Sequence, residues 1–267
     1  MKISFFDGGM IFEINKKYSD YGQYAILNDK NLIKKLHKGY VDIGCEYITS
    51  CNYCFTPKKV NNWEDLTKIS IDLIQDNKAK IFGSIPPFFK SYKIEEITDD
   101  FYNFYYKLIQ LFKNKIDIYL LETCVEYNHV KEIVKIIKEM DKDAKIIVSL
   151  YPNQENSKKI KDYMELDIYG IFINCCSFDT MVSFFNNNLR DCNFKNKKFG
   201  FYCNNINEKK YSEELIIGDL KNFYEKDNIT KIKIKSFLET LPFNEIFIGG
   251  CCGYGIEEMK ELKNMLT

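Results

Sequence analysis

The stretch YGIFINCCSFDTMVSFFNNNLRDCNFKNKKFGFYC, residues 169–203, holds one complete unit of the pattern that decides the fold. An apolar run at 169–175 favours a β-strand, and the segment 178–190 has apolar residues spaced as on one face of a helix. A second apolar run follows at 198–203. A strand, a helix and another strand in this order predict a βαβ unit.

The same alternation extends to both ends of the 267-residue chain. Predicted strands cover residues 3–7, 47–50, 80–84, 117–122, 145–150, 169–175, 198–203 and 245–249. Predicted helices cover residues 31–43, 63–75, 99–112, 126–140, 178–190, 213–224 and 255–266. Eight strands that alternate with helices over about 250 residues are typical of an α/β fold, the (β/α)8 TIM barrel. We expect this barrel in preference to a doubly wound sheet.

The chain shows no internal boundary between domains. No segment rich in proline, glycine or serine divides it, and it contains only five prolines, so we expect residues 1–267 to form a single barrel domain. In such barrels the chemistry takes place at the carboxyl ends of the strands. The polar and sulfur-containing residues at the predicted strand ends are therefore the candidates for a functional site.

Composition excludes several classes of partner. The 38 Lys and Arg residues balance 38 Asp and Glu residues without a long run of one sign, so we expect no binding to nucleic acid or to a membrane surface. No apolar stretch approaches the ~18 residues that a membrane span needs, and the N-terminal sequence lacks the pattern of a signal peptide. We expect a cytoplasmic protein, whose oligomeric state the sequence does not indicate.

Ten cysteines are the most unusual feature of the composition. In a reducing compartment they are expected to be core residues, metal ligands or reactive thiols rather than disulfides. Two adjacent pairs follow predicted strands: Cys175-Cys176 after the sixth, and Cys251-Cys252, within Gly249-Gly250-Cys251-Cys252-Gly253, after the eighth.

The two cysteine pairs allow two interpretations. Neighbouring side chains on a strand point to opposite faces, so Cys251 and Cys252 can share a ligand only if the backbone leaves strand geometry, which the flanking glycines permit. Three thiolates from two strand ends, with one tetrahedral position left open, would describe a catalytic zinc site. The alternative is that these cysteines are small core residues, as free cysteines usually are. The glycines favour the zinc site.

The remaining cysteines have no arrangement that indicates a site. Cys51-Asn52-Tyr53-Cys54 is a C-x-x-C sequence, but there is no second one to complete a zinc ribbon, and a thioredoxin-like motif belongs to a smaller fold. We expect Cys45, Cys124, Cys192 and Cys203 to fill core or surface positions.

The chain has only two histidines, His37 and His129, and neither has a second histidine near it. This excludes a site built on several histidines. His37 lies in the predicted helix 31–43, and we expect it on the surface of that helix.

Several of these motifs together resemble those of the homocysteine S-methyltransferase family. The motifs occur in the family's order and span nearly the whole chain, with Gly249-Gly250-Cys251-Cys252-Gly253 after Asn174-Cys175 as the most specific of them. The others are Asp7-Gly8-Gly9-Met10, Leu36-His37-Lys38-Gly39-Tyr40 through Gly44, Ile48-Thr49, and Glu122-Thr123. Gly83-Ser84-Ile85-Pro86-Pro87, followed by Ser91-Tyr92, is similar to the branch that uses S-methylmethionine or S-adenosylmethionine.

The resemblance assigns roles to individual residues. It implies that Cys175, Cys251 and Cys252 bind zinc, and that Cys176 does not. It also implies a pocket for the amino-acid end of homocysteine, in which carboxylates can hold an ammonium and glycine N–H groups can receive a carboxylate. The residues implied for this pocket are Asp7, Gly8, Gly9, Thr49 and Glu122. The ring of Tyr53 is a candidate for the donor site, since a sulfonium is attracted by an aromatic face.

The implied reaction is zinc-dependent transfer of a methyl group from S-methylmethionine or S-adenosylmethionine to the thiol of homocysteine, which gives methionine. Two alternatives remain open: an enzyme of the same fold with another thiol or selenol acceptor or a betaine-type donor, and a noncatalytic zinc-thiolate barrel. Two motifs depart from the family, at Thr49-Ser50-Cys51-Asn52-Tyr53 and at Tyr202-Cys203-Asn204, where the family usually has Thr-Thr-Asn and Tyr-Pro-Asn. We therefore expect the pocket to differ in detail.

Overall fold

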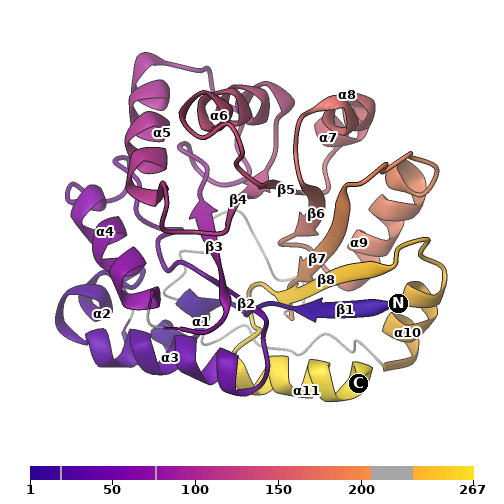
Figure 1. The fold of residues 1–267 in the computed structure, drawn as a ribbon, viewed down its shortest axis with the longest axis horizontal. Coiled ribbons are helices and arrows are strands. Elements are labelled where there is room, and N and C mark those ends of the chain that lie inside the picture. Colours follow the sequence, from indigo (N-terminus) through magenta and orange to yellow (C-terminus); the bar gives the residue numbers. More distant parts are fainter. Residues whose placement is uncertain (19, 76, 206–230) are drawn as a thin grey trace.

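The structure, a computed structural model, describes residues 1–18, 20–75, 77–205 and 231–267. Within these residues eight parallel strands form a nearly closed barrel surrounded by helices (Figure 1). This confirms the predicted (β/α)8 TIM barrel. The strands are β1 (Lys2–Phe5), β2 (Tyr47–Thr49), β3 (Lys80–Ile85), β4 (Ile118–Cys124), β5 (Ile146–Leu150), β6 (Gly170–Asn174), β7 (Lys198–Cys203) and β8 (Glu245–Gly250).

The barrel closes at two different kinds of junction. The continuous ladder runs in the order β1-β8-β7-β6-β5-β4-β3-β2, so the first strand pairs directly with the last, as the indigo and yellow arrows in Figure 1 show. Between β1 and β2 there is no ladder but a single parallel bridge from Phe6 to Tyr47, beside a hydrogen bond from the Glu46 N–H to the Phe5 carbonyl at 2.8 Å. Because all eight strands are parallel, their carboxyl ends form one rim.

The helices α3, α4, α5, α6 and α11 agree closely with the predicted segments, whereas α1, α2, α7, α8 and α10 were not predicted. None of the described helices has the length and apolar character needed to cross a membrane. The predicted helix 213–224 lies outside the described residues. The helices are α1 (Met10–Asn15), α2 (Gln23–Asn28), α3 (Lys30–Asp42), α4 (Trp63–Ile74), α5 (Asp99–Phe112), α6 (Tyr127–Met140), α7 (Gln154–Lys158), α8 (Ile160–Glu165), α9 (Phe178–Phe184), continued by a π-helical turn at Phe185–Leu189, α10 (Lys231–Glu239) and α11 (Ile256–Leu266).

Aromatic rings fill the inside of the barrel. The Phe6 ring lies 5.5 Å from Phe82, 5.8 Å from Phe172 and 5.2 Å from Tyr202, centroid to centroid. Glycine on a neighbouring strand makes this packing possible, because a Cβ at Gly249 would overlap the Phe6 ring. The barrel interior is therefore a packed core that supports the rim from below.

The position of His37 differs from the prediction. This residue is fully buried on α3, in a stripe with Ile33, Leu36 and Tyr40. The spacing of these residues is the i, i+3, i+4, i+7 pattern of a core-facing helix side. The prediction that His37 lies on the surface was therefore wrong, and the spacing itself indicates that the residue is buried. Burial lowers the pKa of His37 to about 3, which keeps the ring neutral. Neither ring nitrogen has a hydrogen-bond partner among the described residues.

Candidate functional site

A cavity of about 320 Å³ opens at the carboxyl rim of the barrel. Every residue that the sequence singled out as a site residue lines it, although these residues come from five different strand ends and are up to 245 positions apart. They are Asp7, Gly8, Gly9, Thr49, Tyr53, Glu122, Cys175, Cys251 and Cys252. The structure thus brings the whole predicted set to one place.

The three predicted metal ligands converge. The sulfur atoms of Cys175, Cys251 and Cys252 all lie within 4.8 Å of one another, and the sulfurs of Cys175 and Cys251 are 3.5 Å apart. In a tetrahedral site with metal–sulfur bonds of about 2.3 Å, two sulfur ligands are separated by ~3.8 Å. This is the one group of three potential ligands at such spacing among the residues that the structure describes.

Both cysteine segments leave strand geometry, as their convergence requires. Strand β6 ends at Asn174, and Cys175 has a left-handed backbone with a φ of 59°. Strand β8 ends at Gly250, and the following turn is closed by a hydrogen bond from the Tyr254 N–H to the Cys251 carbonyl at 3.2 Å. Gly253 occupies the third position of that turn with a φ of 81°, a conformation that favours glycine. Cys176 packs instead into the hydrophobic core.

Residues after β7 hold the two cysteine segments together. The Cys252 N–H donates to the side-chain oxygen of Asn204 at 3.3 Å, and the Asn205 N–H donates to the Cys252 carbonyl at 2.8 Å. The Asn204 N–H in turn donates to the Cys176 carbonyl at 2.8 Å. Sequence reasoning noted Tyr202-Cys203-Asn204 only as a departure from the family, and it missed this bridging role.

The three sulfurs are chemically suited to a cation. The neighbouring sulfurs of Cys175 and Cys252, together with burial, raise the pKa of the Cys251 thiol well above its ordinary value. Three thiolates at these distances repel one another unless a positive charge lies between them. A soft divalent metal such as zinc, which prefers thiolates and deprotonates them on binding, fits this donor set.

Asp7 is buried at the end of β1, where it faces β2. Its two carboxylate oxygens accept hydrogen bonds from the N–H and the hydroxyl of Thr49, both at 2.7 Å. Burial raises the pKa of Asp7 to about 7, against the opposing effect of these two hydrogen bonds. No basic side chain among the described residues compensates this carboxylate.

Glu122 is the second acid of the cavity and lies on β4. Its carboxylate accepts a hydrogen bond from the Ser84 hydroxyl and another from the Tyr202 hydroxyl at 3.4 Å. Burial raises the pKa of Glu122 to about 7, and the nearby Asp7 charge adds to the effect. A cavity with two such carboxylates favours a cationic ligand group.

Gly8 and Gly9 allow the loop after β1 to pack directly on the cysteine turn. A Cβ at Gly8 would collide with the Tyr254 carbonyl, and a Cβ at Gly9 would lie 2.7 Å from the Cys251 carbonyl. The Gly9 N–H donates to the Tyr254 carbonyl at 2.7 Å. This N–H is therefore used within the protein.

Two tyrosines form the outer wall of the cavity. The Tyr53 hydroxyl lies 2.9 Å from the Ser91 hydroxyl and donates to the Thr123 hydroxyl at 3.3 Å. The Tyr92 hydroxyl lies 2.8 Å from the sulfur of Cys175, which places the β3–α5 loop against this sulfur. Sequence reasoning quoted Tyr92 within a motif but assigned it no role.

The other cysteines lie apart from this cluster. Cys51 and Cys54 are buried and also line the cavity, but they are not in the group of three. Cys45, Cys124 and Cys203 are buried and Cys192 is half-buried, which confirms the prediction that they fill core or surface positions.

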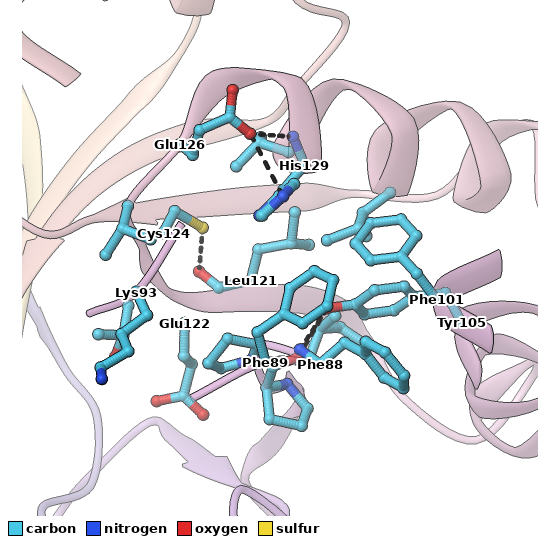
Figure 2. A pocket seen from close by; sticks show the side chains of 17 residues that line it. Phe88, Phe89, Lys93, Phe101, Tyr105, Leu121, Glu122, Cys124, Glu126 and His129 are labelled. Atoms are coloured by element: carbon cyan, nitrogen blue, oxygen red, sulfur yellow. Dashed lines mark hydrogen bonds and ion pairs between the residues drawn. The ribbon is translucent and has the colours of Figure 1, made fainter. Parts of the chain in front are cut away.

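A second, smaller cavity of about 30 Å³ lies on the outer side of β4, between α5 and α6. Figure 2 shows that Phe88, Phe89 and Phe101 crowd it and that the Glu122 carboxylate points away from these rings. It is large enough for about one water molecule, so it is packing space beside the site.

Comparisons with known proteins agree with this arrangement. The model of one family, homocysteine S-methyltransferase, matches residues 4–266. The solved structure of homocysteine methyltransferase MmuM from Escherichia coli in its metallated form is 14% identical, with a TM-score of 0.74, over 99% of this chain and 96% of that one. The apo form of the same protein is 15% identical, with a TM-score of 0.73 and the same coverage. A comparison with curated protein sequences finds no significant match.

Proposed function

The chain belongs to the homocysteine S-methyltransferase family, and from this premise we propose that it transfers a methyl group from a sulfonium donor to the thiol of homocysteine, with zinc bound by Cys175, Cys251 and Cys252. The observation that carries the proposal is the position of the three sulfurs in one cavity with two buried carboxylates. The product would be methionine, and the donor S-methylmethionine or S-adenosylmethionine.

The cavity can supply what methyl transfer to sulfur needs. A free thiol with a pKa of ~8.5 is mostly protonated at neutral pH and is a poor nucleophile. Zinc bound to the three cysteines would convert the thiol of homocysteine into a thiolate, because a coordinated thiol loses its proton. No histidine lines the cavity, and a mechanism of this kind requires no general base.

Asp7 and Glu122 are proposed to hold the ammonium group of homocysteine. An ammonium between them would offset the burial that raises the pKa of both carboxyls. Thr49 fixes the Asp7 carboxylate with two hydrogen bonds, while Ser84 and Tyr202 fix Glu122. Because each acid accepts two hydrogen bonds, the amino-acid end of the substrate would be oriented before reaction.

Tyr53 is proposed to face the cationic methyl donor. Its hydroxyl is fixed by Ser91 and Thr123, so the ring keeps a constant position at the wall of the cavity. Holding sulfur and methyl carbon at near-attack separation contributes on the order of 7 kcal/mol when the orientation is good. Such orientation would be the main contribution of the protein side chains to the rate.

The proposal is tested by metal analysis together with a methyl-transfer assay. We expect about one zinc per chain, and methionine formed from homocysteine with S-methylmethionine or S-adenosylmethionine. Cys251→Ser should lose zinc and activity together, whereas Cys176→Ala should keep both, because Cys176 packs in the core outside the group of three.

The outcomes separate the alternatives. Zinc without methionine formation would indicate another acceptor, a betaine-type donor, or a noncatalytic barrel. Zinc that stays stoichiometric in Cys251→Ser would contradict the assigned ligands. We also propose that residues 1–267 form a single barrel domain and that the protein is cytoplasmic. The reduced thiols that the site requires support this location.

A further inference from the structure

Among the described residues that line the cavity, one has a basic side chain, and this is Lys59 in the loop between β2 and α4. Asp7 and Glu122 line the same cavity. An amino-acid substrate carries both an ammonium and a carboxylate, and the two acids match only the first of these groups. The carboxylate requires a positive charge or free N–H donors.

The loop fixes the backbone of Lys59, although the residue itself is exposed. The N–H groups of Lys59 and Val60 both donate to the Thr56 carbonyl at 2.9 Å, and the Val60 side chain is buried. The ammonium of Lys59 lies 5.5 Å from the centroid of the Tyr53 ring. Within the described part of the chain, Lys59 makes no ion pair, so its charge is available to a ligand.

The glycine loop is a weaker alternative for the carboxylate. The resemblance assigned this group to the N–H donors of Gly8 and Gly9, but the Gly9 N–H donates to the Tyr254 carbonyl at 2.7 Å, which leaves the Gly8 N–H as the one donor of the two without a backbone partner among the described residues. The charge of Lys59 also reaches into the cavity, since it opposes the burial that raises the pKa of the Cys54 thiol to about 11.

We propose that Lys59 binds the carboxylate of an amino-acid substrate and so determines the specificity of the cavity. This rests on the proposed function, which it deepens by naming the residue that selects carboxylate-bearing substrates. The carboxylate could come from homocysteine or from an amino-acid sulfonium donor, because both carry the same group. Because Lys59 lies beside the Tyr53 ring, the proposed donor site, we expect the carboxylate to be that of an amino-acid donor, whose negative charge would also offset the repulsion between the ammonium of Lys59 and the sulfonium.

Lys58 provides a matched control in the same loop. It is the neighbouring residue and is exposed, as Lys59 is, and its ammonium also lies over an aromatic ring, 5.3 Å from the centroid of Phe88. It does not line the cavity. Lys58→Met therefore removes the same charge and the same kind of ring contact without touching the site.

The experiment compares substrates with and without the carboxylate in zinc-loaded wild-type, Lys59→Met and Lys58→Met proteins. The acceptor pair is homocysteine and 3-aminopropanethiol, and the donor pair is S-methylmethionine and (3-aminopropyl)dimethylsulfonium. Loss of a charged hydrogen bond should lower kcat/KM for a carboxylate-bearing substrate about 10- to 100-fold in Lys59→Met. Its decarboxylated counterpart should react as in wild type, and the pair that shows the loss identifies the source.

The proposal would be overturned if Lys59→Met lowered kcat/KM equally for both members of each pair. It would also be overturned if Lys58→Met and Lys59→Met had equal effects on kcat/KM. Calorimetric binding of the same four compounds separates this result from failure of the proposed function. If wild type transfers no methyl group, a preference for the carboxylate-bearing compounds that disappears in Lys59→Met still supports the role of Lys59. Wild-type protein that binds them no more tightly than the decarboxylated compounds overturns it.

Discussion

At the scale of single residues, the site depends on a few side chains whose surroundings change their chemistry. Asp7 and Glu122 are buried acids with a raised pKa, and Cys251 is a thiol whose deprotonation is opposed by its neighbours. Each of these groups is poorly matched to its own environment. A cationic ligand or a metal ion would remove the mismatch, so substrate and metal should stabilise the residues that bind them.

Tyr92 should strengthen metal binding through Cys175. Its hydroxyl lies 2.8 Å from that sulfur and can donate a hydrogen bond to the thiolate. Partners of this kind commonly change metal affinity 10- to 100-fold. We expect Tyr92→Phe to weaken zinc binding at least about 10-fold in competition with a chelator. Tyr106→Phe, at another exposed tyrosine far from the sulfurs, should leave affinity unchanged, and equal affinities for all three proteins would refute the role.

Asp7 should make stability depend on pH in a defined direction. Its pKa is about 7 in the folded protein and close to 3.8 when exposed, so the folded state binds more protons between these values. The contribution of Asp7 to the free energy of unfolding is therefore fully present below pH ~4 and is lost as the pH rises through 7.

Asp7→Asn tests this dependence in zinc-free protein. Loss of a hydrogen bond to Thr49 should lower stability by a similar amount at every pH. Asparagine does not titrate, so the pH-dependent contribution of Asp7 is absent from the variant. The difference in Tm between variant and wild type should accordingly move in favour of the variant from pH 5 to pH 8. A constant difference would show that Asp7 does not titrate in this range. His37, which titrates in the opposite direction, is present in both proteins and cancels.

At the scale of elements, the sequence predicted the strands and long helices, which show a periodic pattern of apolar residues. It missed the short helices and the contacts between loops. The predicted ends of the strands differ from those observed by at most two residues, and β7 agrees at both ends. Helices α1, α2 and α7 have six, six and five residues, which is too short for a 3.6-residue repeat to stand out. The predicted site residues were found together, but the loop contacts of Tyr92, Asn204 and Lys59 follow from packing between segments distant in sequence.

The packing of Phe6 against β8 should make Gly249 irreplaceable. A Cβ at Gly249 would overlap the Phe6 ring, which the rings of Phe82, Phe172 and Tyr202 surround in the barrel interior. We expect Gly249→Ala to lower the free energy of unfolding by roughly 1–3 kcal/mol.

Gly39→Ala on α3 is the matched control, measured in the same denaturant titration. A Cβ there would clash only with the terminal methyl of Ile256, a flexible atom that can move, and would make ordinary contacts with the rest of that side chain. Alanine also favours helix formation by up to about 1 kcal/mol. A Gly249→Ala protein as stable as the Gly39→Ala protein would show that the barrel interior is loosely packed.

At the scale of the whole molecule, substrate binding should raise the stability of the barrel. A ligand present at a hundred times its Kd and bound only by the native state contributes about 2.7 kcal/mol. For a chain of this size that corresponds to a rise in Tm of roughly 5 °C or more. We expect homocysteine to produce this rise in zinc-loaded protein.

Homoserine, which carries a hydroxyl in place of the thiol, should produce a smaller rise, and zinc-free protein should respond weakly to both compounds. Zinc-loaded protein whose Tm does not respond to homocysteine would favour the noncatalytic barrel.

The junction between β1 and β2 gives the barrel one weak point. A single backbone bridge joins these strands, and just above it the Asp7 carboxylate binds the N–H and hydroxyl of Thr49. The Asp7 side chain thus joins β1 to β2 at the rim, and the same side chain lines the cavity. If Asp7 binds the ammonium of the substrate as proposed, ligand binding and closure of the barrel depend on the same side chain, and an occupied cavity should stabilise the β1–β2 junction.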